Sequence, residues 1–175
     1  MVNETGAPRA IVVMGVSGSG KTSIAEAIAG RLVLHFVEGD ALHPAANVEK
    51  MSHGIPLTDE DRMPWLDLIG AEIAAAIGRG EGIVVSCSAL KRIYRDRLRR
   101  EAGAPLAFVY LEGSKELLTR RMGERKGHFM PTSLLESQLQ TLEAPTGEPG
   151  VVTVDIDDSI DGIVDAAVRG LAEIA

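Results

Sequence analysis

Five short apolar runs divide the chain, and helical patterns lie between them. The runs cover residues 10–15, 34–38, 83–86, 106–111 and 151–155. After the first run, apolar side chains such as Ile24, Ile28 and Leu32 recur with helical spacing over residues 21–33. Further helices are expected over 47–51, 59–77 and 161–174, and from near Lys91 and Ser114. Strands that alternate with helices predict an α/β three-layer fold with a five-stranded parallel sheet covered on both faces.

Composition narrows the class of protein. The chain has 175 residues, 45% of them hydrophobic, which suits one domain with a core and a single small-molecule cleft. Its 25 acidic residues exceed its 18 basic ones, and the net charge of -7 disfavours nucleic acid and acidic membrane surfaces as partners. Cys87 is the only cysteine, so an intrachain disulfide is excluded, and no stretch resembles a signal peptide or a membrane span. We therefore expect a single-domain cytoplasmic protein.

A glycine-rich loop lies between the first strand and the first helix. It matches the pattern G-x-x-x-x-G-K-[ST] through Gly15, Val16, Ser17, Gly18, Ser19, Gly20, Lys21 and Thr22. Glycines let the backbone N–H groups and the helix N-terminus wrap closely around phosphates. We expect Lys21 to reach the β- and γ-phosphates of ATP, and the Thr22 hydroxyl to bind Mg²⁺. This context predicts a phosphate-loop NTPase or kinase fold.

A polar stretch over residues 123–132 has the composition of a mobile lid, although an ordinary solvated loop has the same composition. Arg121 and Arg125 lie one helical turn apart at its start, so both guanidinium groups are candidates to meet the nucleotide or the transferred phosphoryl group. Lid closure would exclude water, which otherwise competes for the phosphoryl group. A small metabolite kinase is the class that these features favour.

Two carboxylates follow the second strand, at the edge of a parallel sheet where ligands bind. Asp40 is the candidate to orient the acceptor hydroxyl and take its proton, and Glu38 is the candidate to hold a water molecule of Mg²⁺. Either carboxylate would alternatively cap the turn after Gly39. His43 is a candidate donor to a substrate hydroxyl.

Three cations near the strand ends suggest that the acceptor is an anion. Arg62 follows an acidic turn, and Lys91 and Arg95 lie at the start of the helix after the third strand. An arginine in this place suits a substrate carboxylate. The alternative for Lys91 and Arg95 is a solvated basic stripe that pairs with neighbouring acidic residues such as Asp96.

Several blocks between about residues 12 and 145 resemble the gluconokinases of the phosphate-loop type. Beside the phosphate loop, the blocks are residues 38–44 (EGDALHP), 50–51, 54–57 (GIPL), 59–66, 87–92 (CSALKR), 94–96 and 127–131 (GHFMP). The resemblance implies ATP-dependent phosphorylation of D-gluconate at C6, with Mg²⁺ and often as a homodimer. It further implies that Asp40 orients the C6 hydroxyl, and that His43, Arg62, Lys91 and Arg95 hold the polyol and its carboxylate.

Two alternatives remain at this point. A more distant likeness to shikimate kinases rests on the phosphate loop, the acidic site after the second strand and a basic lid, but the third strand ends in SCSAL rather than in a glycine run. A regulatory module that binds ATP without turning it over is the alternative from another class. Such a module predicts tight ATP binding and a dispensable Asp40.

Overall fold

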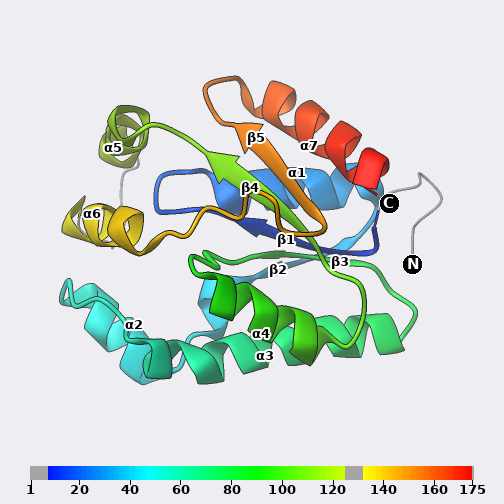
Figure 1. The fold of residues 1–175 in the computed structure, drawn as a ribbon, viewed down its shortest axis with the longest axis horizontal. Helices are drawn as coiled ribbons and strands as arrows, with labels where there is room; N and C mark the ends of the chain where they lie inside the picture. Colours follow the sequence, from blue (N-terminus) through cyan, green and yellow to red (C-terminus); the bar gives the residue numbers. More distant parts are fainter. Residues whose placement is uncertain (1–7, 125–131, 175) are drawn as a thin grey trace.

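The protein is a three-layer α/β structure in which one parallel sheet separates two layers of helices (Figure 1). The structure is a computed structural model that describes residues 8–124 and 132–174. Its strands are β1 (Ala10–Met14), β2 (His35–Glu38), β3 (Ile83–Ser86), β4 (Ala107–Glu112) and β5 (Val151–Asp155). Its helices are α1 (Lys21–Leu32), α2 (Ala45–Ser52), α3 (Asp59–Gly78), α4 (Arg92–Ala102), α5 (Lys115–Glu124), α6 (Thr132–Thr141) and α7 (Ile160–Ile174).

The sheet has the order β2-β3-β1-β4-β5, and every pair of neighbours is parallel. β1 lies at the centre, where Val12 is opposite Val85 of β3 and Phe108 of β4. All five residues of β1 are buried, because helices cover a parallel sheet on both faces. The predicted fold class is confirmed.

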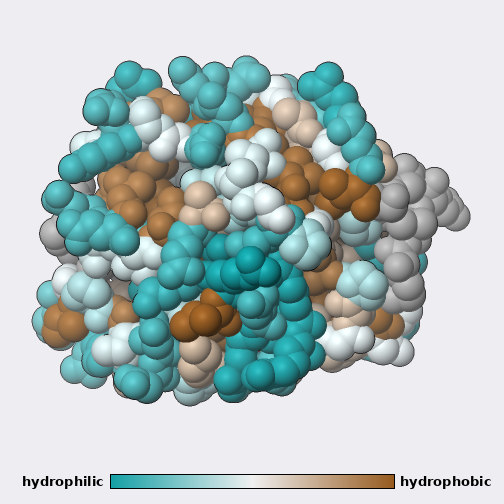
Figure 2. Space-filling view, in the orientation of Figure 1, coloured by the Kyte–Doolittle hydropathy of each residue, from teal (hydrophilic) through white to brown (hydrophobic). Residues whose placement is uncertain are grey.

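One layer of helices lies on each face of the sheet. Helices α1 and α7 cover one face of the sheet, and α3 packs against α4 on the other (Figure 1). α3 begins at Asp59 because Thr58 and Asp61 form a capping box, in which each side chain binds the other residue's backbone N–H. The outward face of α4 is hydrophilic (Figure 2), whereas Tyr94, Arg95 and Leu98 of the same helix are buried.

Two elements were not predicted from the sequence. A 3₁₀ turn over Gly39–Leu42 follows β2, and α6 follows the segment that we interpreted as a lid. Most of that segment, residues 125–131, lies outside the residues that the structure describes. Within the described ranges, no helix is long and apolar enough to cross a membrane.

Candidate active site

The phosphate loop joins β1 to α1, as its sequence pattern predicted. Gly18 and Gly20 have φ values of 85° and 84°, which belong to the left-handed region that favours glycine. A Cβ atom at Gly18 would lie 2.8 Å from the carbonyl oxygen of Leu118 in α5, so glycine is also required there by packing. The hydroxyl of Ser19 is buried in the loop and has no hydrogen-bond partner among the described residues. A phosphate oxygen is a group that would satisfy this hydroxyl.

A carboxylate joins the phosphate loop to the ends of two neighbouring strands. The Thr22 hydroxyl donates to Oε2 of Glu38 at 2.6 Å, and the Ser86 hydroxyl donates to Oε1 of the same carboxylate at 2.6 Å. The close approach of the strand ends explains why residue 39 is glycine, since a Cβ atom there would lie 2.0 Å from the Ser86 carbonyl oxygen. Magnesium binds oxygen ligands and usually keeps several waters and phosphate oxygens. The hydroxyl of Thr22 and the carboxylate of Glu38 fit this requirement.

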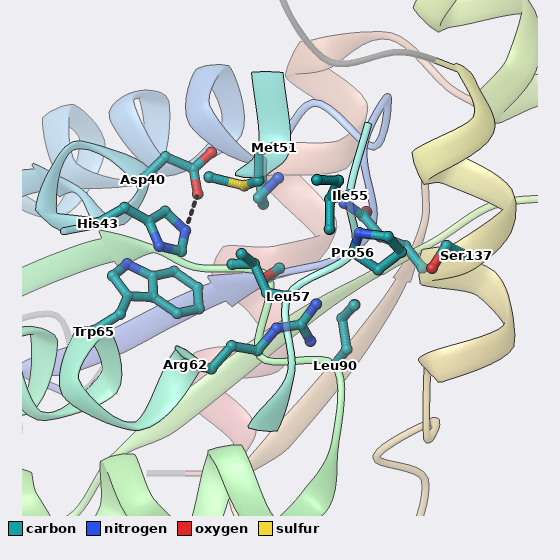
Figure 3. A pocket seen from close by; sticks show the side chains of 13 residues that line it. Asp40, His43, Met51, Ile55, Pro56, Leu57, Arg62, Trp65, Leu90 and Ser137 are labelled. Carbon is teal, nitrogen blue, oxygen red and sulfur yellow. Dashed lines mark ion pairs between the residues drawn. The ribbon is translucent and has the colours of Figure 1, made fainter. Parts of the chain in front are cut away.

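A pocket next to Lys21 brings together four of the predicted site residues (Figure 3). They are Lys21, Asp40, His43 and Arg62, which come from α1, the 3₁₀ turn, the loop after it and α3. One wall of the pocket is apolar and comes mainly from the connection between α2 and α3. The remaining lining residues are Met51, Ile55, Pro56, Leu57, Trp65, Ser88, Leu90, Ser137 and Gln138. The pocket therefore offers both charge for an anion and polar groups for hydroxyls.

The imidazole of His43 is held in a fixed plane beside Asp40. Its ring stacks on the indole of Trp65, with 3.9 Å between ring centroids and an angle of 16° (Figure 3). The indole Nε1–H donates to the carbonyl oxygen of Gly39 at 2.8 Å, which ties the stack to the turn that carries Asp40. Burial lowers the pKa of His43 to about 4, although the Asp40 carboxylate acts in the opposite direction. His43 is therefore neutral near pH 7.

Arg62 lines the pocket and is 9% exposed. Its guanidinium carbon lies 5.2 Å from the centre of the Tyr94 ring, and Nη1 donates to the Tyr94 hydroxyl at 3.3 Å. Burial, and then a hydrogen bond to Asp59, raises the pKa of Tyr94 to about 12, so the phenol stays neutral. Arg62 is thus a permanent cation that faces the pocket on a neutral aromatic support.

Lys91 does not line this pocket. Its ammonium group donates to the Asp59 carboxylate at 2.9 Å, and the Tyr94 hydroxyl donates to the same oxygen. Asp59 therefore neutralises Lys91 outside the pocket that contains Arg62. Lys91 therefore does not line the pocket with His43 and Arg62, the residues with which the sequence analysis grouped it.

Arg95 is also absent from the pocket lining, and it is fully buried. Its Nε and Nη2 donate to the two carboxylate oxygens of Glu148 at 3.0 and 2.6 Å. Its Nη1 donates to the carbonyl oxygen of Ala89 at 2.7 Å, and Nη2 also donates to that of Glu143 at 2.8 Å. Both of our expectations for Arg95 need correction, because it neither faces the pocket nor belongs to a solvated stripe. We call Arg95, Glu148 and the adjoining Arg99 the Arg95 cluster, since Arg99 donates to Glu148 at 3.1 Å.

A second cavity, of about 450 Å³, lies on the other side of the phosphate loop. Gly18, Ser19 and Gly20 form one side of it, and Arg121 of α5 lies across from them together with the turn before α7. Nη2 of Arg121 donates to the carbonyl oxygen of Ile156 at 2.6 Å, which fixes the arginine at the cavity. The cavity therefore has room for a group that extends from a phosphate held in the loop. Arg125, the other predicted lid arginine, lies outside the described residues.

Sequence reasoning missed the contribution of α6. The Ser17 backbone N–H in the phosphate loop donates to Oε1 of Gln138 at 2.8 Å, and Ser137 and Gln138 line the pocket next to Lys21. The apolar spacing of Leu135, Leu139 and Leu142 is helical and would have revealed this helix. No comparable signal in the sequence indicates that α6 lies against the phosphate loop.

Comparisons with known proteins bear on the family of the chain. Residues 11–145 match the AAA domain family AAA_33. The chain is 51% identical over 162 residues to a gluconokinase of Gluconobacter oxydans, covering 93% of this chain and 90% of that protein. It is 44% identical to the thermosensitive gluconokinase of Escherichia coli, over 91% of this chain and 85% of that one. The crystal structure of a gluconokinase from Sinorhizobium meliloti 1021 superposes with a TM-score of 0.87 at 57% identity, covering 95% of this chain and 93% of that one.

Proposed function

Since the chain belongs to the gluconokinase family, we propose that it transfers the γ-phosphoryl group of ATP to the C6 hydroxyl of D-gluconate, giving 6-phospho-D-gluconate and ADP. The single observation that carries this proposal is the acceptor pocket. There the phosphate-loop Lys21, the carboxylate of Asp40 and the buried cation of Arg62 meet beside one apolar wall. A small acceptor with a hydroxyl at one end and a carboxylate at the other matches these groups.

The nucleotide is proposed to bind through the phosphate loop, with Lys21 at the β- and γ-phosphates and the base in the cavity beside Arg121. Thr22, and Glu38 through a water molecule, would hold Mg²⁺, which neutralises phosphate charge when it is bound. Lys21 stabilises the charge that develops on the transferred group. Arg125 remains a candidate for the same task.

At the acceptor end, Asp40 orients the hydroxyl and accepts its proton as the new bond to phosphorus forms. Arg62 binds the substrate carboxylate, for which its planar fork of donors is suited. His43 donates to a hydroxyl of the substrate. Lys91 and Arg95 have no part in this proposal, because Lys91 is paired with Asp59 and Arg95 with Glu148.

A coupled ADP-release assay tests the proposed reaction. Mg²⁺-ATP is offered with gluconate, shikimate, several sugars, nucleoside monophosphates or no acceptor. We expect release that depends on gluconate. Release with shikimate or another acceptor instead would show that gluconate is not the substrate. No release with any acceptor would favour the regulatory module.

The variant Lys21→Ala tests the phosphate loop separately. We expect transfer to fall to the background of the assay, because the charge on the transferred phosphoryl group loses its main protein partner. The variant should keep the melting temperature of the wild type. Substantial residual transfer by a folded Lys21→Ala protein contradicts the assignment.

Two further proposals rest on the family and on the use of ATP. We infer a homodimer, which light scattering of the purified protein tests directly. We also place the protein in the cytoplasm, where ATP and sugar acids are available to a kinase. Fractionation of the cells that make it tests that location.

A further inference from the structure

A buried asparagine lies behind the imidazole of His43. Asn47 of α2 is 3% exposed, and its Nδ2 lies 2.9 Å from the carbonyl oxygen of Asp61 and 3.2 Å from Nδ1 of His43. A backbone carbonyl can only accept a hydrogen bond, so the atom facing Asp61 must be the amide nitrogen. The orientation of the Asn47 amide is therefore determined by chemistry. Its second N–H points to the ring of His43.

This contact decides where the imidazole carries its proton. A neutral imidazole has one donor and one acceptor nitrogen, and Nδ1 must accept here because the amide nitrogen of Asn47 can only donate. The proton is consequently on Nε2. The charged groups around the ring are Asp40, Arg62 and Lys21, and burial outweighs the attraction of Asp40, so the pKa stays near 4 and the ring stays neutral.

The protonated nitrogen faces the carboxylate of Asp40. Nε2 of His43 lies 4.0 Å from Oδ1 of Asp40 (Figure 3), which is too far for a direct hydrogen bond. A hydroxyl oxygen between the two atoms would lie at about 2.8 Å from each, an ordinary hydrogen-bond distance. It would accept from Nε2–H and donate its own proton to Asp40.

We propose that Asn47 is a positioning residue that holds His43 in the Nε2–H tautomer, so that His43 and Asp40 present one donor and one acceptor to the hydroxyl that receives the phosphoryl group. This inference rests on the proposed kinase function. During transfer, the hydroxyl oxygen forms its bond to the γ-phosphorus, the bond from phosphorus to the leaving ADP oxygen breaks, and the hydroxyl proton moves to Asp40. In the opposite tautomer, the lone pair on Nε2 would compete with Asp40 for that proton.

The tautomer itself is measurable without any substrate. The nitrogen NMR spectrum of protein labelled in its histidine rings should show His43 with a protonated Nε2 and an unprotonated Nδ1, assigned by the loss of this signal in His43→Gln. A protonated Nδ1 in the wild type overturns the proposal. Because this readout needs neither ATP nor gluconate, it is independent of whether gluconate is the substrate.

The variant Asn47→Asp should reverse the tautomer. A carboxylate can only accept, so it draws the proton to Nδ1, and its negative charge raises the pKa of His43. We expect kcat to fall about tenfold or more at pH 7 with the KM for ATP unchanged. A raised pKa brings imidazolium into the assay range, and imidazolium carries an N–H on both nitrogens, so part of the lost kcat should return as the pH decreases, unlike in the wild type.

Two matched variants separate positioning from structural support. Asn47→Ala removes both donors without adding a carboxylate, so it should lower kcat without the recovery at acid pH. Lys50→Met removes the ion pair of Lys50 with Asp61, at 2.7 Å, which also joins α2 to α3. It should lower only the melting temperature. If Asn47→Asp retains the wild-type tautomer and pH profile, Asn47 has a structural role alone and the proposal is wrong.

Discussion

Arg62 and Arg95 are both buried arginines near the ends of strands, yet the regions around them differ. Arg95 gives four hydrogen bonds to Glu148 and to two backbone carbonyl groups, all within the protein. Arg62 has the hydroxyl of Tyr94 as its partner and lines the acceptor pocket. Burial alone therefore does not distinguish a binding arginine from a structural one. The distinction depends on which acceptors its donors already have.

The comparison predicts opposite effects for substitutions in the two regions. Changes in the acceptor pocket should alter kinetics and leave stability nearly unchanged, whereas changes in the Arg95 cluster should do the reverse. The reason is that a pocket residue's interactions are completed by the substrate, while the interactions of the Arg95 cluster are completed on folding. Unfolding and steady-state measurements on the same variants test both halves.

The largest effect is expected for Arg95→Leu. Removing one partner of a buried ion pair costs roughly 3–5 kcal/mol, because the other charge stays buried. Arg99 still donates to Glu148 at 3.1 Å, so we expect a loss near the lower limit. Urea unfolding measures this change. The KM for gluconate of the remaining folded protein should equal that of the wild type.

Arg97→Leu is the matched control for that variant. Arg97 lies on the same helix and forms a two-bond ion pair with Asp67, at 2.7 and 2.8 Å, but both side chains are partly exposed. Exposed pairs contribute about 0–1 kcal/mol. Equal destabilisation by the two variants would remove the distinction between the Arg95 cluster and the surface of α4.

Asp40→Asn should have the next largest effect, and this effect is kinetic. The amide cannot accept the hydroxyl proton as the carboxylate does, so we expect kcat to fall by roughly 100-fold or more. ATP binding, measured by calorimetry, should stay close to that of the wild type. If the affinity for ATP falls by as large a factor as kcat, Asp40 acts in nucleotide binding instead. A variant with unchanged turnover would show that Asp40 does not take the hydroxyl proton.

The sequence predicts the nucleotide side of the site better than the acceptor side. The phosphate loop is one contiguous motif, so its place between β1 and α1 follows from local pattern alone. The acceptor pocket is built from distant segments, and helix spacing grouped Lys91 with Arg95. Glu148, the partner of Arg95, is 53 residues away along the chain, and the sequence has no local signal of that pairing.

Arg62→Lys should have a smaller effect that is specific to the acceptor. A lysine keeps the charge but loses the fork that binds a carboxylate through two donors. We expect the KM for gluconate to rise about tenfold, which corresponds to about 1.4 kcal/mol, with the KM for ATP unchanged. Steady-state kinetics with each substrate varied in turn measures both constants.

Arg95→Lys is the counterpart of this variant in the Arg95 cluster. It should lower the free energy of unfolding without raising the KM for gluconate, because its ammonium group cannot reproduce the bonds to both oxygens of Glu148. If Arg95→Lys raises that KM as much as Arg62→Lys does, the substrate carboxylate depends on both arginines and the comparison fails.

The smallest expected effect is on how stability depends on pH. Hydrogen bonds from Arg95, and then from Arg99, hold the pKa of Glu148 below its usual value, although burial acts against them. A pKa that is lower in the folded state gives stability above the unfolded-state pKa, and that stability is lost as the pH falls through the folded-state value. One such carboxylate changes the free energy of unfolding by at most about 1.4 kcal/mol per pH unit.

Glu148→Gln should therefore be less stable than the wild type at pH 7 and lose less stability between pH 5 and pH 3, as urea unfolding at each pH would show. Parallel curves for the two proteins would mean that Glu148 binds protons equally in both states, and that the Arg95 cluster does not depend on its charge.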